Sequence, residues 1–203
     1  MIRSRFLFEP CFRAGLVLAA LTLALPVPHP GYAFAPSEPA IITVHADRML
    51  ATVNPLLFGH NYGPWMNITD PYIALYRDIK VTLLRFPAGN WGDENDLFPN
   101  NLDDLATLAR ALGAEIVVQA RLFRGTPEKA AEVVRYCNVE HDYDFRYWEI
   151  GNEPDLYKNR RHRRGDPEFT VEWYNARFRE FAKAMKAVDP TIQIAGPVVT
   201  GGW

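Results

Sequence analysis

Short apolar segments alternate with longer amphipathic segments along this chain, and this alternation restricts its fold more than any other feature. After residue 55 the apolar segments have the length and β-branched content of strands, and the amphipathic segments have the length of helices. A strand, a helix and a further strand in succession predict parallel pairing through right-handed crossovers. The expected strands are 56–61, 81–86, 115–120, a segment from 147 to the Asn-Glu-Pro sequence at 152–154, and 192–198; the expected helices are 70–80, 101–112, 128–138 and 170–188.

Local signals set the ends of two of these helices, and the whole pattern predicts the fold class. Asp70 and Pro71 are a typical helix start, with Asp70 as the N-cap and Pro71 at the first helical position, where no N–H is needed. Gly113 is a typical helix end because glycine accepts a left-handed backbone. Four strand–helix units and a fifth strand are part of a (β/α)8 TIM barrel, which needs about 250 residues where this chain has 203. We therefore expect an α/β fold that ends within the barrel.

Residues 1–35 have the pattern of a secretory signal peptide. The apolar run within them is too short to span a bilayer as a stable helix, and the prolines that follow it argue against an uncleaved membrane anchor. We expect a secreted or periplasmic protein with no stable membrane association after cleavage. The marks of the signal are positive charges at Arg3, Arg5 and Arg13, the apolar run at 15–25, and small cleavage-site residues at Ala33 and Ala35.

Charge and cysteine content exclude several classes of function. The formal net charge of −2 predicts no general attraction to nucleic acid or to anionic membranes. The sequence has no metal-ligand spacing, phosphate-binding loop or nucleotide fingerprint, so no cofactor is expected. Cys11 lies in the signal peptide and Cys137 is the second of two cysteines, so an internal disulfide is not expected. Near the end of the helix at 128–138, Cys137 is expected to be a buried structural thiol, with a nucleophile as the alternative.

The segment that begins at Tyr147 leads directly into Asn152, Glu153 and Pro154. A barrel strand with a carboxylate at its C-terminal end presents that acid at the rim where barrel enzymes act. Pro154 cannot donate to a sheet ladder and favours an extended backbone at Glu153, so strand pairing should stop there. The alternative is that Glu153 is an ordinary loop carboxylate bonded to neighbouring backbone.

Three segments together resemble clan A of the glycoside hydrolases, which are retaining enzymes on a (β/α)8 barrel. They are Gly151–Asp155, Phe58–Tyr62 and Leu84–Asn90. Within the clan, the chain is similar to the α-L-arabinofuranosidases, the β-xylosidases and the heparanase-like β-glucuronidases, over about residues 41–203. The resemblance implies that Glu153 is the general acid/base and that Asn152 hydrogen-bonds the sugar 2-hydroxyl. It also implies that the nucleophile is a Glu on a seventh strand, beyond this chain.

The same resemblance gives a meaning to the residues ahead of the barrel. The β-branched segment Ile41–Ala46 is expected to form a short strand. In the resembling families such a strand pairs with a β-sandwich domain that follows the barrel. We therefore expect an N-terminal strand segment at 36–54 and an incomplete TIM-barrel glycosidase domain at 55–203.

Polar and aromatic residues follow the first two strands, so they should project from the rim that carries Glu153. Sugars present hydroxyl groups and apolar C–H faces, which polar side chains and aromatic rings bind. For the histidine among them a packing role is the alternative, and for the tryptophans a core role. The substrate-binding candidates are His60, Asn61, Tyr62, Trp65, Asn90 and Trp91, with Gln119 and Arg121 after the third strand as weaker ones.

Strand alternation also predicts an ion pair inside the barrel. Glu149 and Glu153 face the same way, and a charge directed into the barrel needs a partner. Interior layers draw side chains from alternate strands, which places Arg85 in the layer of Glu149. We predict an Arg85–Glu149 pair, either as a support that shifts the pKa of the catalytic carboxyls or as a plain buried ion pair.

The remaining charged residues near the expected rim lie in polar loops. The basic run Arg160–Arg164 could recognise a uronic acid or a sulfated sugar, or it could be a solvated surface loop. Acidic side chains in polar loops are ordinarily solvated. We expect this of Asp93, Glu94, Asp96 and Asp155.

The sequence therefore predicts retaining hydrolysis of O-glycosidic bonds in a polysaccharide or oligosaccharide, with Glu153 as general acid/base. Retention needs two carboxylates, and the second is expected outside this chain, so the chain alone should be inactive. The alternative is a carbohydrate-binding pseudoenzyme or an inactive truncated fragment.

Overall fold

The computed structural model describes residues 41–159 and 169–200, and the chain divides after Met49 into two units. In the first unit, residues 41–49 are exposed and contain a turn in which His45 O accepts from Arg48 N at 3.3 Å. The strand expected at Ile41–Ala46 is not formed. A strand depends on ladder hydrogen bonds to a neighbour, and the described residues of this unit, 41–49, contain no strand.

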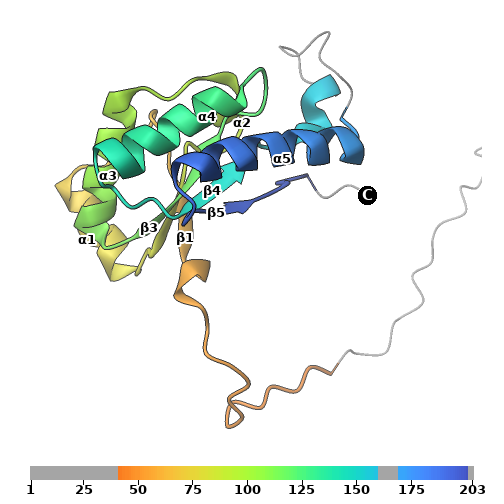
Figure 1. Ribbon diagram of the computed structural model, residues 1–203. Helices are drawn as coiled ribbons and strands as arrows, with labels where there is room; N and C mark the ends of the chain where they lie inside the picture. The colour runs from red at the N-terminus through yellow and green to blue at the C-terminus, as the bar shows by residue number, and fades with distance from the viewer. Residues whose placement is uncertain (1–40, 160–168, 201–203) are drawn as a thin grey trace, which may run out of the picture. The chain divides into compact units, whose positions relative to one another are not determined.

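The second unit is built on a parallel sheet of five strands in sequential order, β1-β2-β3-β4-β5 (Figure 1). The register places Arg85 beside Val117 and Gln119 beside Glu149, so these side chains share one face. The α/β fold with parallel strands is confirmed. The strands are β1 Gly59–Asn61, β2 Leu83–Phe86, β3 Glu115–Ala120, β4 Tyr147–Ile150 and β5 Gln193–Ala195.

Helices connect these strands, and α3, α4 and α5 lie along one face of the sheet (Figure 1). A π-helical turn, η2, continues α4, and two short 3-10 helices precede β1 and follow β4. The helices are α1 Asp70–Asp78, α2 Asn90–Glu94, α3 Pro99–Leu112, α4 Pro127–Val134 and α5 Val171–Val188; the shorter turns are η1 Pro55–Leu57, η2 Arg135–Glu140 and η3 Pro154–Asn159.

The ends of β1 and α1 differ from the expected ones. The side chain of Asn54 accepts from Leu56 N at 3.0 Å and caps η1, so the strand begins at Gly59. Thr69 has the extended backbone of an N-cap, and Asp70 is already helical, where its charge is favourable at the positive end of the helix.

Two later elements are also shorter than expected, while α3 is longer. The regular part of α4 ends at Val134, where η2 takes over, and β5 ends at Ala195. α3 begins at Pro99, where Asn101 Oδ1 accepts from Phe98 N at 3.2 Å. It ends at Leu112, and Gly113 caps it with the predicted left-handed backbone, at φ 67°.

The apolar core lies between the sheet and the helices. The side chains of β2, β3 and β4 that face the helices are buried. Burial is lower on the opposite face of the sheet, where three apolar side chains are only half-buried: Leu83, Val117 and Tyr147. Cys137 is fully buried, as predicted, and burial raises the pKa of its thiol. The core includes Leu84 and Phe86 of β2, Ile116 and Val118 of β3, Trp148 and Ile150 of β4, Leu102 and Leu105 of α3, Val134 of α4, and Phe181 and Met185 of α5.

Within residues 41–159 and 169–200, no helix combines the length and the apolar character needed to cross a bilayer.

Candidate active site

The chain leaves β4 through two residues with left-handed backbones, Gly151 at φ 76° and Glu153 at φ 46°. A side chain at position 151 would place its Cβ 2.9 Å from Leu122 and 3.1 Å from Tyr157 Oη, so glycine is required there. The extended backbone expected at Glu153 is wrong. Its N–H donates to Val198 O at 2.6 Å and its carbonyl accepts from Leu156 N at 3.0 Å, and these two bonds hold the unusual conformation.

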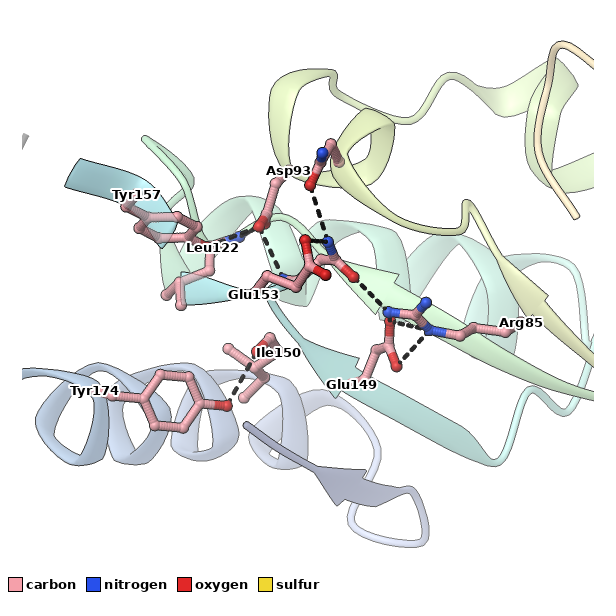
Figure 2. Close-up of polar contacts among 10 residues, drawn as sticks. Arg85, Asp93, Leu122, Glu149, Ile150, Glu153, Tyr157 and Tyr174 are labelled. Carbon is pink, nitrogen blue, oxygen red and sulfur yellow. Dashed lines mark hydrogen bonds and ion pairs between the residues drawn. The ribbon is translucent and has the colours of Figure 1, made fainter. Parts of the chain in front are cut away.

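The predicted ion pair between Arg85 and Glu149 is present beneath this turn (Figure 2). Arg85 Nε lies 2.7 Å and 2.9 Å from the two carboxylate oxygens, and Nη2 lies 2.6 Å from Oε1. The side chain of Glu149 is 5% exposed and that of Arg85 22%. Burial raises the pKa of Glu149, and the guanidinium, which lowers it, offsets only part of that effect. The ion pair with Arg85 therefore stabilises the charged form of Glu149, which burial disfavours.

Arg85 also orients the amide of Asn152, which is 4% exposed. Its Nη2 donates to Asn152 Oδ1 at 2.9 Å, which directs the amide nitrogen away from the ion pair. That Nδ2 donates to Asn90 Oδ1 at 3.0 Å and lies 3.4 Å from Glu153 Oε2. A guanidinium can only donate, so the position of Arg85 decides which way the amide of Asn152 turns.

Asp93 is fully buried, so its expected place as a solvated loop acid is wrong. One oxygen, Oδ1, accepts from Leu122 N at 3.1 Å and lies 3.5 Å from Phe123 N. The other, Oδ2, accepts from Asn152 N at 2.8 Å and from Tyr157 Oη at 2.7 Å (Figure 2). One carboxylate therefore joins α2 to the ends of β3 and β4.

Two glycines close to Asp93 in the sequence explain how this carboxylate becomes buried. Gly89 has φ 74° and starts α2, which sets Asn90 and Asp93 three residues apart on one side of a helical turn. A Cβ at Gly92 would lie 2.6 Å from Pro87 O and 2.7 Å from the side chain of Gln119. The two glycines permit α2 to lie directly against β3, and this contact removes Asp93 from water.

The side chains of His60 and Tyr62 contact other aromatic rings. The ring of His60 lies edge-on to that of Tyr76 in α1, with centroids 5.1 Å apart and Tyr76 Oη 3.3 Å from Nδ1. Tyr62 is 8% exposed and packs against Phe86 with centroids 5.5 Å apart. Both therefore make packing contacts. Asn61 ends β1 and is exposed.

Trp65 and Trp91 form an aromatic pair beside Asn90, with ring centroids 6.1 Å apart. Trp65 is 56% exposed, and its indole occupies the space over Gly63, where a Cβ would lie 2.2 Å from the ring. Trp91 is half-buried. An exposed aromatic face next to a polar amide is a suitable surface for a sugar ring.

Most of the weaker candidates and the other acids have structural partners of their own. Gln119 differs, since neither its amide nitrogen nor its amide oxygen has a hydrogen-bond partner among the described residues. Gln119 is buried under Gly92, and Arg121 binds Asp96 at 2.9 Å, so Asp96 is not an ordinary solvated acid. Lys129 also binds Asp96 at 2.9 Å, and its hydrogen bond holds the pKa of that carboxyl below its usual value. Glu94 is exposed. Asp155 accepts hydrogen bonds from Thr200, and the basic run Arg160–Arg164 lies outside the described residues.

These observations define a class of fold and site. Parallel strands deliver an acid, two amides and a buried ion pair to their carboxyl ends, which is where (β/α) barrel enzymes act. The acid follows an amide directly at the end of the fourth strand. The chain thus forms part of an α/β barrel wall with a candidate active site at its rim.

Comparison with known proteins agrees with this class. No family model matches the chain. It is 22% identical over 214 residues to α-L-arabinofuranosidase C of Emericella nidulans, covering 75% of this chain and 40% of that protein. It is 25% identical over 180 residues to an intracellular exo-α-(1→5)-L-arabinofuranosidase of Halalkalibacterium halodurans, covering 67% and 34%. The chain thus spans about two fifths or less of these relatives.

Solved structures share the fold. A family 51 α-L-arabinofuranosidase from Bifidobacterium longum matches with a TM-score of 0.62 at 19% identity, over 78% of this chain and 41% of that one. A family 44 xyloglucanase from Paenibacillus polymyxa matches with a TM-score of 0.52 at 12% identity, over 71% and 41%. The chain is thus similar to family 51 α-L-arabinofuranosidases and their clan relatives over part of the catalytic domain.

Proposed function

We propose that this chain is the first part of the catalytic barrel of a retaining glycoside hydrolase that acts on arabinofuranosyl groups of a polysaccharide or oligosaccharide. The observation that carries the proposal is the acid–amide pair Asn152–Glu153 at the end of β4, set above the Arg85–Glu149 ion pair. The curated relatives with α-L-arabinofuranosidase activity support the choice of sugar.

In this proposal Glu153 first acts as the acid. Its carboxyl proton passes to the glycosidic oxygen as the bond between that oxygen and the anomeric carbon breaks. A second carboxylate, about 5–5.5 Å away, attacks the anomeric carbon and forms a glycosyl ester. That carboxylate would come from outside the described residues. Glu153, now ionised, takes a proton from a water molecule whose oxygen bonds to the anomeric carbon. The ester bond breaks, which restores the acid form of Glu153 and the free carboxylate of the nucleophile.

Asn152 supplies orientation rather than protons. Because Arg85 holds its Oδ1, its Nδ2 faces the space beside Asn90 and Glu153. A sugar hydroxyl that accepts from Nδ2 would lie next to the carboxyl that protonates the leaving oxygen. A donor fixed before substrate binds needs no reorganisation in the transition state, and this is the main contribution that such polar frameworks make to catalysis.

The signal-peptide pattern of residues 1–35, which lie outside the described residues, supports export of the enzyme to the medium or the periplasm. Such an enzyme would meet polysaccharide substrates there.

The test replaces Glu153 with glutamine in the natural protein at its full length. Without the acid, hydrolysis of substrates with poor leaving groups should slow by about 10²–10⁴-fold, because their leaving oxygen needs a proton. Aryl arabinofuranosides with good leaving groups need little protonation and should be far less affected. Initial rates on both substrate types measure this difference.

Glu94→Gln is the matched control, since it removes an exposed carboxylate from neighbouring α2. It should leave both rates unchanged. An equal loss on both substrates in Glu153→Gln would contradict the acid role. Binding of arabino-oligosaccharides without hydrolysis by the unaltered protein would instead favour a carbohydrate-binding protein.

A further inference from the structure

We propose that Asp93 is a positioning residue that fixes the angle at which the turn after β4 presents Asn152 and Glu153. The inference rests on the proposed function and deepens it. Asp93 belongs to α2, a five-residue helix after β2, yet its hydrogen bonds go to the ends of β3 and β4 and to η3.

The two carboxylate oxygens of Asp93 bind two different parts of the fold. Oδ1 accepts from Leu122 N at 3.1 Å, just beyond the end of β3. Oδ2 accepts from Asn152 N at 2.8 Å and from Tyr157 Oη at 2.7 Å. A carboxylate is planar and rigid, so the Leu122 contact fixes the place where Oδ2 meets the β4 turn.

The second pair of contacts brackets Glu153 along the chain. Asn152 N comes directly before it and Tyr157 Oη follows it in η3, and both bind the same oxygen (Figure 2). Between these anchors Glu153 has a φ of 46°, a conformation that non-glycine residues keep only when their surroundings impose it. Asp93 therefore contributes to holding the acid in a backbone state it would otherwise leave.

Close packing around Gly92 fixes the position of the Asp93 carboxylate relative to the sheet. Gly92 lies so close to Pro87 O that an added Cβ would approach it to 2.6 Å. The side chain of Gln119 confines the same position from the side of β3, at 2.7 Å. α2 thus has little freedom to move relative to the sheet, and the carboxylate of Asp93 keeps a defined distance from both strand ends.

The substitution Asp93→Asn separates the two sets of bonds. The amide oxygen can still accept from Leu122 N, but the amide nitrogen then faces the N–H of Asn152, and two donors cannot bond to each other. The hydroxyl of Tyr157 can rotate and accept instead. The variant thus removes the anchor on Asn152 while it keeps the side chain's volume.

Asp103→Asn is the matched control. Asp103 in α3 also accepts a tyrosine hydroxyl at 2.7 Å, from Tyr136, but it lies away from the β4 turn, against η2. It is subject to the same chemical change and the same loss of a charge-assisted hydrogen bond. It differs in that none of its bonds reaches Asn152 or Glu153.

The experiment compares the two variants in the natural full-length protein. We expect Asp93→Asn to lower kcat on poor-leaving-group arabinofuranosides by about 10- to 100-fold with KM within about threefold, because misplacing the acid impairs chemistry more than binding. Asp103→Asn should leave both constants unchanged. Hydrogen exchange should accelerate in the peptide containing Asn152 of the Asp93→Asn protein, while the peptide containing Leu122 keeps its protection.

Two results would overturn the proposal. One is an unchanged exchange rate at Asn152 in Asp93→Asn; the other is a loss of kcat that Asp103→Asn reproduces at an equal fall in Tm, which would indicate stability alone. Hydrogen exchange does not depend on turnover. If the unaltered protein hydrolyses no glycoside, the proposed function fails, and the exchange result alone then decides whether Asp93 positions the turn.

Discussion

Two aspartates of this chain accept a tyrosine hydroxyl at the same distance and yet stabilise different things. Asp93 is fully buried at the rim, where backbone N–H groups at two strand ends bind it along with Tyr157. Asp103 is half-buried on α3, and its Oδ1 accepts from Tyr136 and Tyr143, both at 2.7 Å. Asp93 therefore fixes the backbone next to the candidate acid, Glu153. Asp103 instead joins two tyrosine side chains.

Two arginines, each linked to one of these aspartates through a shared residue, repeat the contrast. Arg85 binds Glu149 through Nε and Nη2, and Nη2 also donates to Asn152 Oδ1. Removal of Arg85 therefore leaves the buried charge of Glu149 without this partner and the amide of Asn152 without this donor. Arg110 is exposed and lies over the ring of Tyr143, 5.5 Å from its centre. The rim groups thus depend on a buried ion pair, whereas Arg110 in the outer layer makes an exposed contact that can be lost at small cost.

The largest difference should follow from replacing the two arginines with methionine. Arg85→Met strands Glu149 in a buried site and should lower the free energy of unfolding by about 3–5 kcal/mol. Arg110→Met removes one exposed contact between a cation and a ring, worth about 0.5–1 kcal/mol. Urea unfolding of both variants measures the two losses.

A double variant separates the ion pair from its surroundings. Arg85→Met together with Glu149→Leu removes both charges, and most of the lost stability should return because apolar groups can replace a buried pair. A loss below about 1 kcal/mol for Arg85→Met alone would contradict the claim that the rim depends on this buried pair.

A smaller difference is expected between two left-handed glycines. Gly151→Ala adds a methyl group 2.9 Å from Leu122 as well as backbone strain, and it should cost about 2–4 kcal/mol. Gly113→Ala at the end of α3 meets no atom within 4 Å, so strain alone should cost about 1 kcal/mol. Thermal unfolding of both proteins provides the comparison, and equal losses would mean that the packing at Gly151 relaxes freely.

Local and periodic features account for how well the sequence predicted the sheet. β3 matches the predicted range at Glu115–Ala120 because its apolar core has no competing signal. The Arg85–Glu149 pair follows from strand alternation together with the layering of side chains inside a barrel. The strand at Ile41–Ala46 failed because its propensity needs a partner that the described chain does not provide.

The rim was harder to predict because its conformations depend on contacts distant in sequence. The polar sequence around Asp93 predicts a solvated loop acid, because the burial of Asp93 depends on Gly92 fitting against Gln119 in another element. Glu153 was expected to be extended because of Pro154, but its bond to Val198 O overrides that local preference. His60 was expected to follow the first strand, but it lies within β1, and its ring packs edge-on against that of Tyr76.

The smallest effect concerns pH, and it should have opposite signs in the two regions. Hydrogen bonds from Tyr136 and Tyr143 hold the pKa of Asp103 below its ordinary 3.8, so the folded state binds this proton less readily than the unfolded state. The resulting stability is present above pH 3.8 and is lost as the pH falls through the lower folded pKa. The stability curves of the unaltered protein and Asp103→Asn should therefore converge as the pH falls from about 6 to about 3.

Glu149 provides the opposite case, because burial raises its pKa above the ordinary 4.5. The folded state then binds the proton more readily, so this group's contribution to stability decreases as the pH rises from 4.5 through the higher folded pKa. The stability of the unaltered protein relative to Glu149→Gln should therefore rise as the pH falls across that window. Its stability relative to Asp103→Asn should instead fall at low pH. Urea midpoints across the pH series measure both slopes. Slopes of the same sign would mean that Arg85 outweighs burial at the rim, and the two regions would then hold their carboxylates by the same physical cause.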